Sequence, residues 1–218
     1  KSEGERFYVE EFSDYLGDVD LLVQTARAEN PGLPVYVLGH SAGGVIASSY
    51  VFENQDKISG LICESFAFDV GLPHLVQLAL QGVSYLTPHL HVFSLNNADF
   101  SRDPAAVEAM NNDPLIAKES QPAETASEML KAAERLKDNM PSFTVPVLII
   151  HGTDDKATRP AGSQYFYDTA ASTDKTLKLY EGHYHDLLND VDKEIVMADI
   201  LNWVNERVPT ETAAGTGA

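Results

Sequence analysis

The chain has 218 residues, of which 44% are hydrophobic, and this size and composition are typical of one globular domain. Its 15 Lys and Arg residues against 33 Asp and Glu residues give a formal net charge of −18, with acidic side chains spread from Glu3 to Glu211. A surface of this charge argues against nucleic acid and anionic membranes as partners. No apolar run reaches the roughly 18 residues of a membrane span, so we expect no integral membrane segment.

The first part of the chain predicts a helix, a strand, a helix and a strand. Apolar residues recur at helical spacing, and Asn30-Pro31-Gly32 ends this helix: Phe12, Tyr15, Leu16, Val19, Leu22, Val23 and Ala26. The apolar run Val35 to Leu38 predicts a parallel strand covered on both faces. A helix over 43–52 and a buried strand over 58–65 follow. Cys63, the only cysteine, lies in that strand and is expected to act as a small buried hydrophobe.

The middle of the chain, from Phe68 to about Pro141, has helical patterns, several prolines and no clear strand, so we interpret it as a helical insertion. The stretch 71–86 is rich in Leu and Val. A second helix begins after Ser120-Gln121-Pro122 and is expected to place four residues on one face: Met129, Ala133, Leu136 and Met140.

The last part predicts a strand over 145–150, a helix over 162–171, a strand over 176–180 and a helix over 192–208. On the last helix an apolar stripe is expected: Met197, Leu201, Val204 and Val208. Alternating strands and helices predict an α/β fold with a parallel sheet. We divide the chain into a first core part (1–68), a helical lid (69–141), a second core part (142–208) and a disordered tail (209–218).

The pattern Gly39-His40-Ser41-Ala42-Gly43 lies between a predicted strand and a predicted helix, as in a nucleophile elbow. Such a turn holds a serine in a strained conformation, and we expect that only glycine fits at Gly39 and Gly43. The N–H of Ala42 would point at a developing oxyanion. The pattern is short, however, and a glycine-rich bend without chemistry also fits it.

A serine nucleophile needs a base and a carboxylate that orients the base. His151-Gly152-Thr153-Asp154-Asp155 follows one predicted strand, and Glu181-Gly182-His183-Tyr184-His185-Asp186 follows the next. The order Ser, Asp, His is that of α/β hydrolases. From these residues alone, Asp154 or Asp155 could be the acid and His183 or His185 the base, and Glu64 is a further candidate acid. We expect His40 and His151 to be hydrogen-bonded structural histidines.

The chain resembles the monoacylglycerol lipase and lysophospholipase branch of the α/β-hydrolase superfamily, also called serine aminopeptidase S33-like. The resemblance covers nearly the whole chain and rests on four motifs: Gly39 to Gly44, Ser101-Arg102-Asp103-Pro104 with Asn112-Asp113-Pro114-Leu115, His151 to Asp155, and Gly182 to Leu188. It implies Ser41 as nucleophile, Asp155 as acid and His185 as base, with Ala42 as an oxyanion donor. It further implies a lid over the site, and the expected substrate-binding residues are His40, Leu75 and Leu78.

The resemblance implies a serine esterase or lipase that cleaves medium or long acyl esters through an acyl-enzyme, with no metal and no cofactor. A peptidase, amidase or thioesterase would use the same triad, and a ligand-binding protein without turnover is a further alternative. The family's oxyanion loop upstream of the elbow has no counterpart here, and residues 1–6 resemble the end of a motif that follows the fourth strand of relatives. We therefore expect an N-terminally incomplete chain whose strand Val35 to Leu38 is a sheet edge. The oligomeric state and the compartment are left open, with the cytoplasm favoured.

Overall fold

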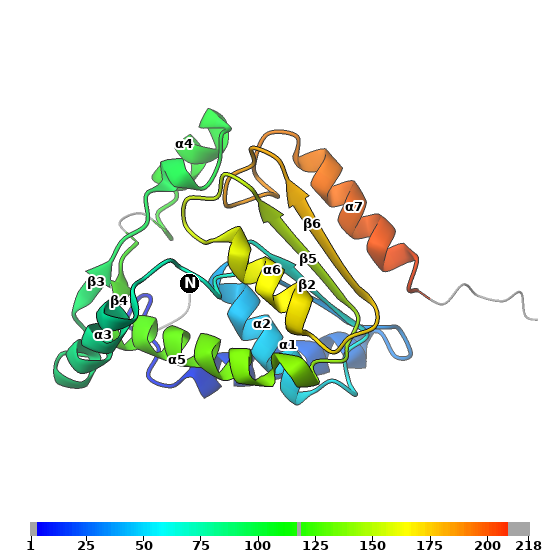
Figure 1. Cartoon of the computed structure of the whole chain (residues 1–218), viewed down its shortest axis with the longest axis horizontal. Coiled ribbons are helices and arrows are strands. Elements are labelled where there is room, and N and C mark those ends of the chain that lie inside the picture. The colour runs from blue at the N-terminus through cyan, green and yellow to red at the C-terminus, as the bar shows by residue number, and fades with distance from the viewer. Residues whose placement is uncertain (1–3, 117–118, 209–218) are drawn as a thin grey trace, which may run out of the picture.

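The computed structural model describes residues 4–116 and 119–208. A parallel sheet of four strands lies at its centre, in the order β1-β2-β5-β6 (Figure 1). These strands are β1 Tyr36–His40, β2 Gly60–Glu64, β5 Val147–Gly152 and β6 Lys175–Tyr180. The predicted parallel α/β fold is therefore confirmed. The predicted tail, 209–218, lies outside the described residues.

Helices cover both faces of the sheet because the strand residues alternate between them. On one face, Leu61 and Cys63 of β2 and Val147 and Ile149 of β5 pack against four helices. These are α1 Phe12–Glu29, α2 Ala42–Glu53, α5 Ala123–Asn139 and α6 Pro160–Thr169. On the other face, Ile62, Leu148 and Ile150 pack against α7 Lys193–Asn205. No helix in the described ranges is long and apolar enough to cross a membrane.

The buried side of α7 differs from the predicted stripe. Val196, Ile200, Trp203 and Val204 face the sheet, whereas Met197, Leu201 and Val208 are exposed. The prediction failed because α7 is apolar on several sides, so its pattern fits more than one stripe. On α1, Phe12 and Val23 are buried and Tyr15, Leu16 and Val19 pack against the core as predicted, whereas Ala26 is only partly buried and Leu22 is 69% exposed.

Strand β1 is an edge of the sheet among the described residues, as predicted, since its register partners all belong to β2. The prediction that both its faces are covered is wrong, because Leu38 is 43% exposed. Leu38 shares a face with Tyr36, which packs against Trp203 of α7. The apolar cluster around α7 thus includes Tyr36 and does not extend along β1 to Leu38.

The insertion forms a lobe beside the sheet (Figure 1). It contains α3 His74–Leu86, α4 Pro104–Asn112 and a short antiparallel pair, β3 His91–Phe93 with β4 Gln121–Pro122. The prediction of an insertion without strands is therefore wrong. These strands are too short to show alternation in the sequence, and β4 contains a proline. Helix α5 leads from the lobe into the core, where Ala133, Leu136 and Met140 are buried and Met129 is partly buried, as predicted.

Candidate active site

Ser41 lies at a sharp turn between β1 and α2, with φ of 53° and ψ of −121°. A residue with a Cβ atom adopts this backbone conformation only at a cost in free energy, and such strain is common at functional sites. Close packing holds the turn, because a Cβ atom on Gly39 would lie 2.3 Å from the carbonyl oxygen of Gly43. The strand, the strained serine and the helix together have the geometry of the predicted elbow.

The expectation that Gly43 must also be glycine is wrong. A Cβ atom on Gly43 would meet no other atom within 4 Å, and its φ is not positive. The second close approach is at Gly44, where a Cβ atom would lie 2.9 Å from Cδ2 of Phe66. Residue spacing alone does not distinguish these two neighbouring glycines.

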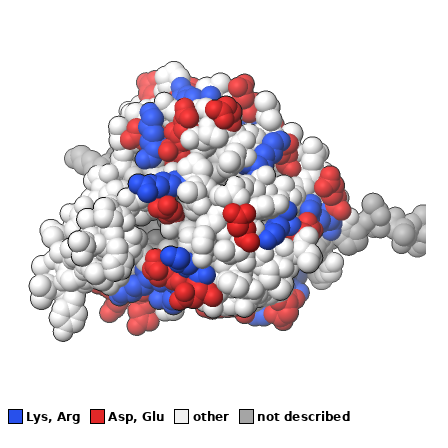
Figure 2. Space-filling view, in the orientation of Figure 1, with Lys and Arg blue, Asp and Glu red and all other residues white. Residues whose placement is uncertain are grey.

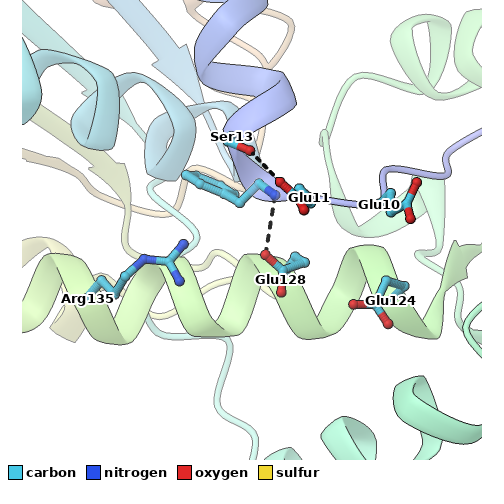
Figure 3. Close-up of a pocket in the computed structure, with 7 residues that line it drawn as sticks. Glu10, Glu11, Ser13, Glu124, Glu128 and Arg135 are labelled. Atoms are coloured by element: carbon cyan, nitrogen blue, oxygen red, sulfur yellow. Dashed lines mark hydrogen bonds between the residues drawn. The ribbon is translucent and has the colours of Figure 1, made fainter.

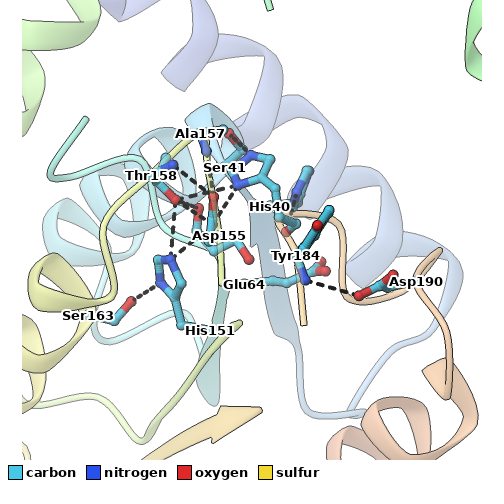
Figure 4. A network of polar contacts seen from close by, with 12 residues as sticks. His40, Ser41, Glu64, His151, Asp155, Ala157, Thr158, Ser163, Tyr184 and Asp190 are labelled. Carbon is cyan, nitrogen blue, oxygen red and sulfur yellow. Dashed lines mark hydrogen bonds and ion pairs between the residues drawn. The ribbon is translucent and has the colours of Figure 1, made fainter. Parts of the chain in front are cut away.

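The structure brings Ser41, His185 and Asp155 together, and Figure 4 shows Ser41 and Asp155 within this polar network. Nε2 of His185 lies 2.8 Å from Oγ of Ser41, and Nδ1 lies 2.7 Å from Oδ2 of Asp155. An ionised carboxylate can only accept a hydrogen bond, so Nδ1 carries a proton and Nε2 is left to accept the Ser41 hydroxyl proton. The His185 side chain and the Asp155 side chain are both fully buried. This arrangement can deprotonate Ser41 when an acyl group is attacked.

Asp155 is held as an anion by several donors. Its Oδ1 accepts the backbone N–H groups of Ala157 at 2.7 Å and Thr158 at 2.9 Å. Burial alone would raise the pKa of Asp155, but hydrogen bonds from His151 and His185 and the N–H of Thr158 bring it well below its usual range. Asp155 is therefore ionised at neutral pH, and the carboxylate keeps His185 in the tautomer that accepts from Ser41.

The alternative acids and base lie elsewhere. Asp154 is exposed, and its backbone N–H donates to the carbonyl oxygen of His183. His183 has its Nδ1 3.6 Å from Oδ2 of Asp190 and its ring against Tyr180. The backbone carbonyl of Glu64 accepts from the N–H of Ser41, but its side chain accepts from the N–H of Leu188 instead of contacting His185. The geometry thus favours Asp155 and His185, the pair that the resemblance implies.

His40, Glu64 and Asp186 form a second polar cluster behind the base. Their donor atoms lie within 4.8 Å of one another, a spacing that could suit a metal ion. Burial, followed by the nearby Asp186 carboxylate, raises the pKa of Glu64 to about 8. Burial and the neighbouring His185 lower the pKa of His40 to about 4. A carboxyl that keeps its proton at neutral pH is a poor metal ligand.

His40 borders the base directly. Its Nε2 lies 3.4 Å from the carbonyl oxygen of His185, and the two rings are 4.8 Å apart. This contact agrees with the expected structural role, and the substrate-binding role of His40 stays a prediction. Ala42 is the first residue of α2, where a backbone N–H has no partner within the helix. Its role as an oxyanion donor likewise stays a prediction.

Residues 100–102 of the insertion support the base loop, and the sequence did not reveal this role. Asp190 is buried and accepts from the backbone N–H of Arg102 at 2.6 Å, from Nε of Arg102 at 2.8 Å and from the N–H of Tyr184 at 3.0 Å. The Phe100 ring packs edge-on against His185, with centroids 4.8 Å apart. The motif beginning at Ser101 was the only available signal, and it carries no indication of its partner.

Leu75 and Leu78, the expected acyl-chain residues, lie on α3 and are 78% and 48% exposed. In this conformation they face solvent, and their substrate-binding role stays a prediction. Helix α3 contains no Lys, Arg, Asp or Glu, and Figure 2 shows this end of the molecule largely without charged side chains. Helix α3 therefore presents an uncharged surface on which Leu75, Leu78 and Leu86 are exposed.

A separate hollow of about 490 Å³ lies between the start of α1 and α5 (Figure 3). It contains none of the predicted site residues, and two of its carboxylates already have partners. Glu128 accepts from the N–H of Phe12 at 3.2 Å and from Lys131 at 2.7 Å. Glu11 accepts from the hydroxyl of Ser13 at 3.1 Å. The hollow therefore adds no group to the triad.

Comparison with known proteins identifies the family. The model of the family described as "Serine aminopeptidase, S33" matches residues 1–192. Monoglyceride lipase of Homo sapiens is 32% identical over 223 residues, covering 100% of this chain and 73% of that protein. Monoacylglycerol lipase of Mycolicibacterium smegmatis is 30% identical over 206 residues, covering 94% and 74%. The crystal structure of Paleococcus ferrophilus monoacylglycerol lipase has a TM-score of 0.85 at 25% identity, covering 95% of this chain and 79% of that one. The chain therefore belongs to the serine aminopeptidase S33 family, in its monoacylglycerol lipase-like branch, and has the α/β-hydrolase fold.

Proposed function

We propose that the chain hydrolyses carboxylic esters of the monoacylglycerol type through an acyl-enzyme on Ser41. The observation that carries this proposal is the continuous hydrogen-bonded path from Oγ of Ser41 through His185 to Asp155. Family membership and relatives that are monoacylglycerol lipases support the ester class. A protein that only binds a ligand has no need of three aligned groups of this kind.

The mechanism follows from the positions of these groups. Oγ of Ser41 attacks the ester carbonyl while its proton passes to Nε2 of His185, and the N–H of Ala42 donates to the oxyanion. The tetrahedral intermediate then expels the alcohol, which takes the proton from Nε2. Water next attacks the acyl-enzyme, again giving its proton to His185, and collapse releases the carboxylic acid and returns the proton to Ser41. Asp155 stays ionised throughout and stabilises the His185 imidazolium.

The exposed hydrophobic residues of α3 support a substrate with a medium or long acyl chain. Leu75 and Leu78 lie on the uncharged helix α3, where an acyl chain would remove apolar surface from water. Each methylene group that such a chain buries contributes about 0.8 kcal/mol. We therefore expect kcat/KM to rise from acetyl to octanoyl to oleoyl monoglycerides.

The test combines a covalent probe with a set of substrates. A fluorophosphonate should label the wild-type chain and not S41A, and fatty acid release from monoglycerides should disappear in S41A. Aminoacyl amides and acyl thioesters, measured in parallel, identify a peptidase or a thioesterase. Labelling that survives in S41A would contradict the nucleophile, and faster turnover of amides or thioesters than of monoglycerides would contradict the substrate class.

A further inference from the structure

The acid of the triad has a second histidine beside it. Nε2 of His151 lies 3.0 Å from Oδ2 of Asp155, the same oxygen that is 2.7 Å from Nδ1 of His185. The side chains of His151 and Asp155 are completely buried, so no water competes for this contact. His151 comes from β5, next to Gly152, where a Cβ atom would lie 2.3 Å from the backbone oxygen of His183. The strand is thus pressed against the base loop, and His151 has little room to move.

The other nitrogen of His151 is also occupied. Nδ1 lies 2.7 Å from Oγ of Ser163, which is fully buried on α6. Because ionised Asp155 can only accept, Nε2 of His151 must carry the proton on that side. In the neutral ring Nδ1 is then an acceptor, and the Ser163 hydroxyl can donate to it. By donating to Nδ1, the Ser163 hydroxyl supports the tautomer of His151 that donates to Asp155.

We propose that His151, held by Ser163, is a positioning residue that fixes the Asp155 carboxylate toward His185 and sets how strongly Asp155 acts on that base. This inference rests on the proposed triad. It assigns His151 a part in the reaction through Asp155, whereas the sequence indicated only a structural histidine. The polar contacts of His151 are with Asp155, Ser163 and Thr158, so it acts on the base only through Asp155.

The chemical effect follows from the shared oxygen. Oδ2 of Asp155 faces Nδ1 of His185, Nε2 of His151 and Oγ1 of Thr158, which lies 2.8 Å away. Each donor withdraws negative charge from Oδ2, so the His151 N–H weakens the hold of Asp155 on a proton at His185. The His151 N–H also helps to prevent rotation of the Asp155 carboxylate. It holds Oδ2 while the backbone N–H groups of Ala157 and Thr158 hold Oδ1. Loss of the His151 donor should therefore favour protonated His185 at higher pH and loosen the triad.

Other charged and titratable groups also lie near His185 and contribute to its electrostatic environment. His40 from β1 lies against its ring, and Asp186 follows it in the base loop. Glu64 from β2 lies behind His40 and close to Asp186. None of these groups contacts Asp155, so substitutions at His151 leave their arrangement in place.

The test compares four variants. H151L removes both ring nitrogens, H151Q keeps an N–H donor near the position of Nε2, and S163A frees the tautomer of His151. S172A removes another buried serine hydroxyl, which contacts Asp174 before the start of β6 instead of the triad, and serves as the matched control. The readouts are kcat and KM for a monoglyceride, the pH dependence of fluorophosphonate labelling of Ser41, and the downfield proton resonance of His185 Nδ1–H, which needs no turnover.

We expect H151L to lower kcat roughly 10-fold to 100-fold at nearly unchanged KM, because misalignment in a triad has effects of that size. The acidic limb of its pH profile should move upward by about half a unit or more. H151Q should recover most of both effects, S163A should show a smaller change in the same direction, and S172A should match the wild type. The His185 Nδ1–H resonance should shift in H151L and return toward the wild-type position in H151Q.

The proposal is overturned if H151L is merely less stable, with wild-type kcat, acidic limb and Nδ1–H resonance. It is also overturned if H151Q shows no recovery relative to H151L. If H151L fails to fold, S163A decides, since an unchanged acidic limb and kcat there contradict the role of the Ser163 contact. Wild-type chain that is labelled at Ser41 but does not cleave monoglycerides contradicts the substrate class alone. Wild-type chain that is not labelled contradicts the proposed function, and the Nδ1–H resonance then tests the positioning of Asp155.

Discussion

Arg102 and Asp190 join the insertion to the loop that carries His185. Nε of Arg102 donates to Oδ2 of Asp190 at 2.8 Å, and its backbone N–H donates to Oδ1 at 2.6 Å. The Asp190 side chain is completely buried, whereas that of Arg102 is 29% exposed. The position of the base therefore depends on a segment far from it in the sequence.

Replacing Arg102 with Met should lower the free energy of unfolding by roughly 2–4 kcal/mol, because it leaves a buried carboxylate without its cation. Hydrogen bonds from Tyr184, Arg102 and Val191 outweigh burial and lower the pKa of Asp190. A lowered pKa contributes stability above the carboxyl's unfolded pKa of ~4, and this contribution is lost as the pH falls. Urea unfolding at pH 7 and pH 3 should therefore show a smaller effect of R102M at pH 3. K137M, at an exposed position on α5, is the control and should change stability by less than about 0.5 kcal/mol.

Alanine at Gly39 and at Gly43 should have opposite consequences. G39A places a methyl group 2.3 Å from a backbone oxygen, which should cost about 3 kcal/mol or more and displace Ser41. G43A meets open space within α2, where alanine is favoured over glycine by about 0.5–1 kcal/mol. Chemical denaturation of both variants measures the difference. Equal losses of stability would contradict the packing described for the elbow.

Substituting asparagine for Asp154 and Asp155 one at a time tests which of the two is the acid of the triad. D155N should lower kcat by about 10⁴-fold, since the amide favours the wrong tautomer of the base. D154N should stay within a few-fold of the wild type, because Asp154 is exposed and only its backbone N–H contacts the base loop. Steady-state kinetics on one monoglyceride tests both variants. A larger effect of D154N than of D155N would reverse the assignment.

The sequence was sufficient where local pattern and function coincide. The strand, turn and helix around Ser41 are encoded by adjacent residues, and the acid and base loops directly follow strands whose carboxyl ends meet at one edge of the sheet. The sequence was not sufficient where more than one side of a helix is equally apolar. Helix α7 has apolar residues on more than one side, and only contact with Ile62 and Leu148 selects Val196 and Trp203. The contact between His151 on β5 and Ser163 on α6 is a tertiary contact that no residue spacing predicts.

The contribution of Glu64 to the free energy of unfolding should fall as the pH rises, and E64Q should remove this pH dependence. Its pKa is raised to about 8, whereas an unfolded glutamate titrates near ~4.3. Between these values the unfolded chain releases the proton that the folded chain keeps, so the contribution of Glu64 to stability falls as the pH rises, by a few kcal/mol at pH 8. His40, Asp186 and Tyr180 face this carboxyl and are unchanged in E64Q.

Urea unfolding at pH 5 and pH 8 measures this effect. The stability of E64Q relative to the wild type should increase between the two pH values, since glutamine keeps an acceptor for the N–H of Leu188 and does not titrate. The same difference at both pH values would show that Glu64 is already ionised in the folded chain.

The rate at which a thiol reagent modifies Cys63 measures how often the core of this molecule opens. The only thiol of the chain is fully buried in β2, 3.3 Å from Oγ of Ser48, and burial raises its pKa to about 12. Thiol reagents attack the thiolate, so modification has to wait until β2 separates from α2. Strand β2 ends at Glu64, whose carbonyl oxygen accepts from the N–H of Ser41. The rate of Cys63 modification therefore reports how often the strand that supports the nucleophile separates from its neighbours.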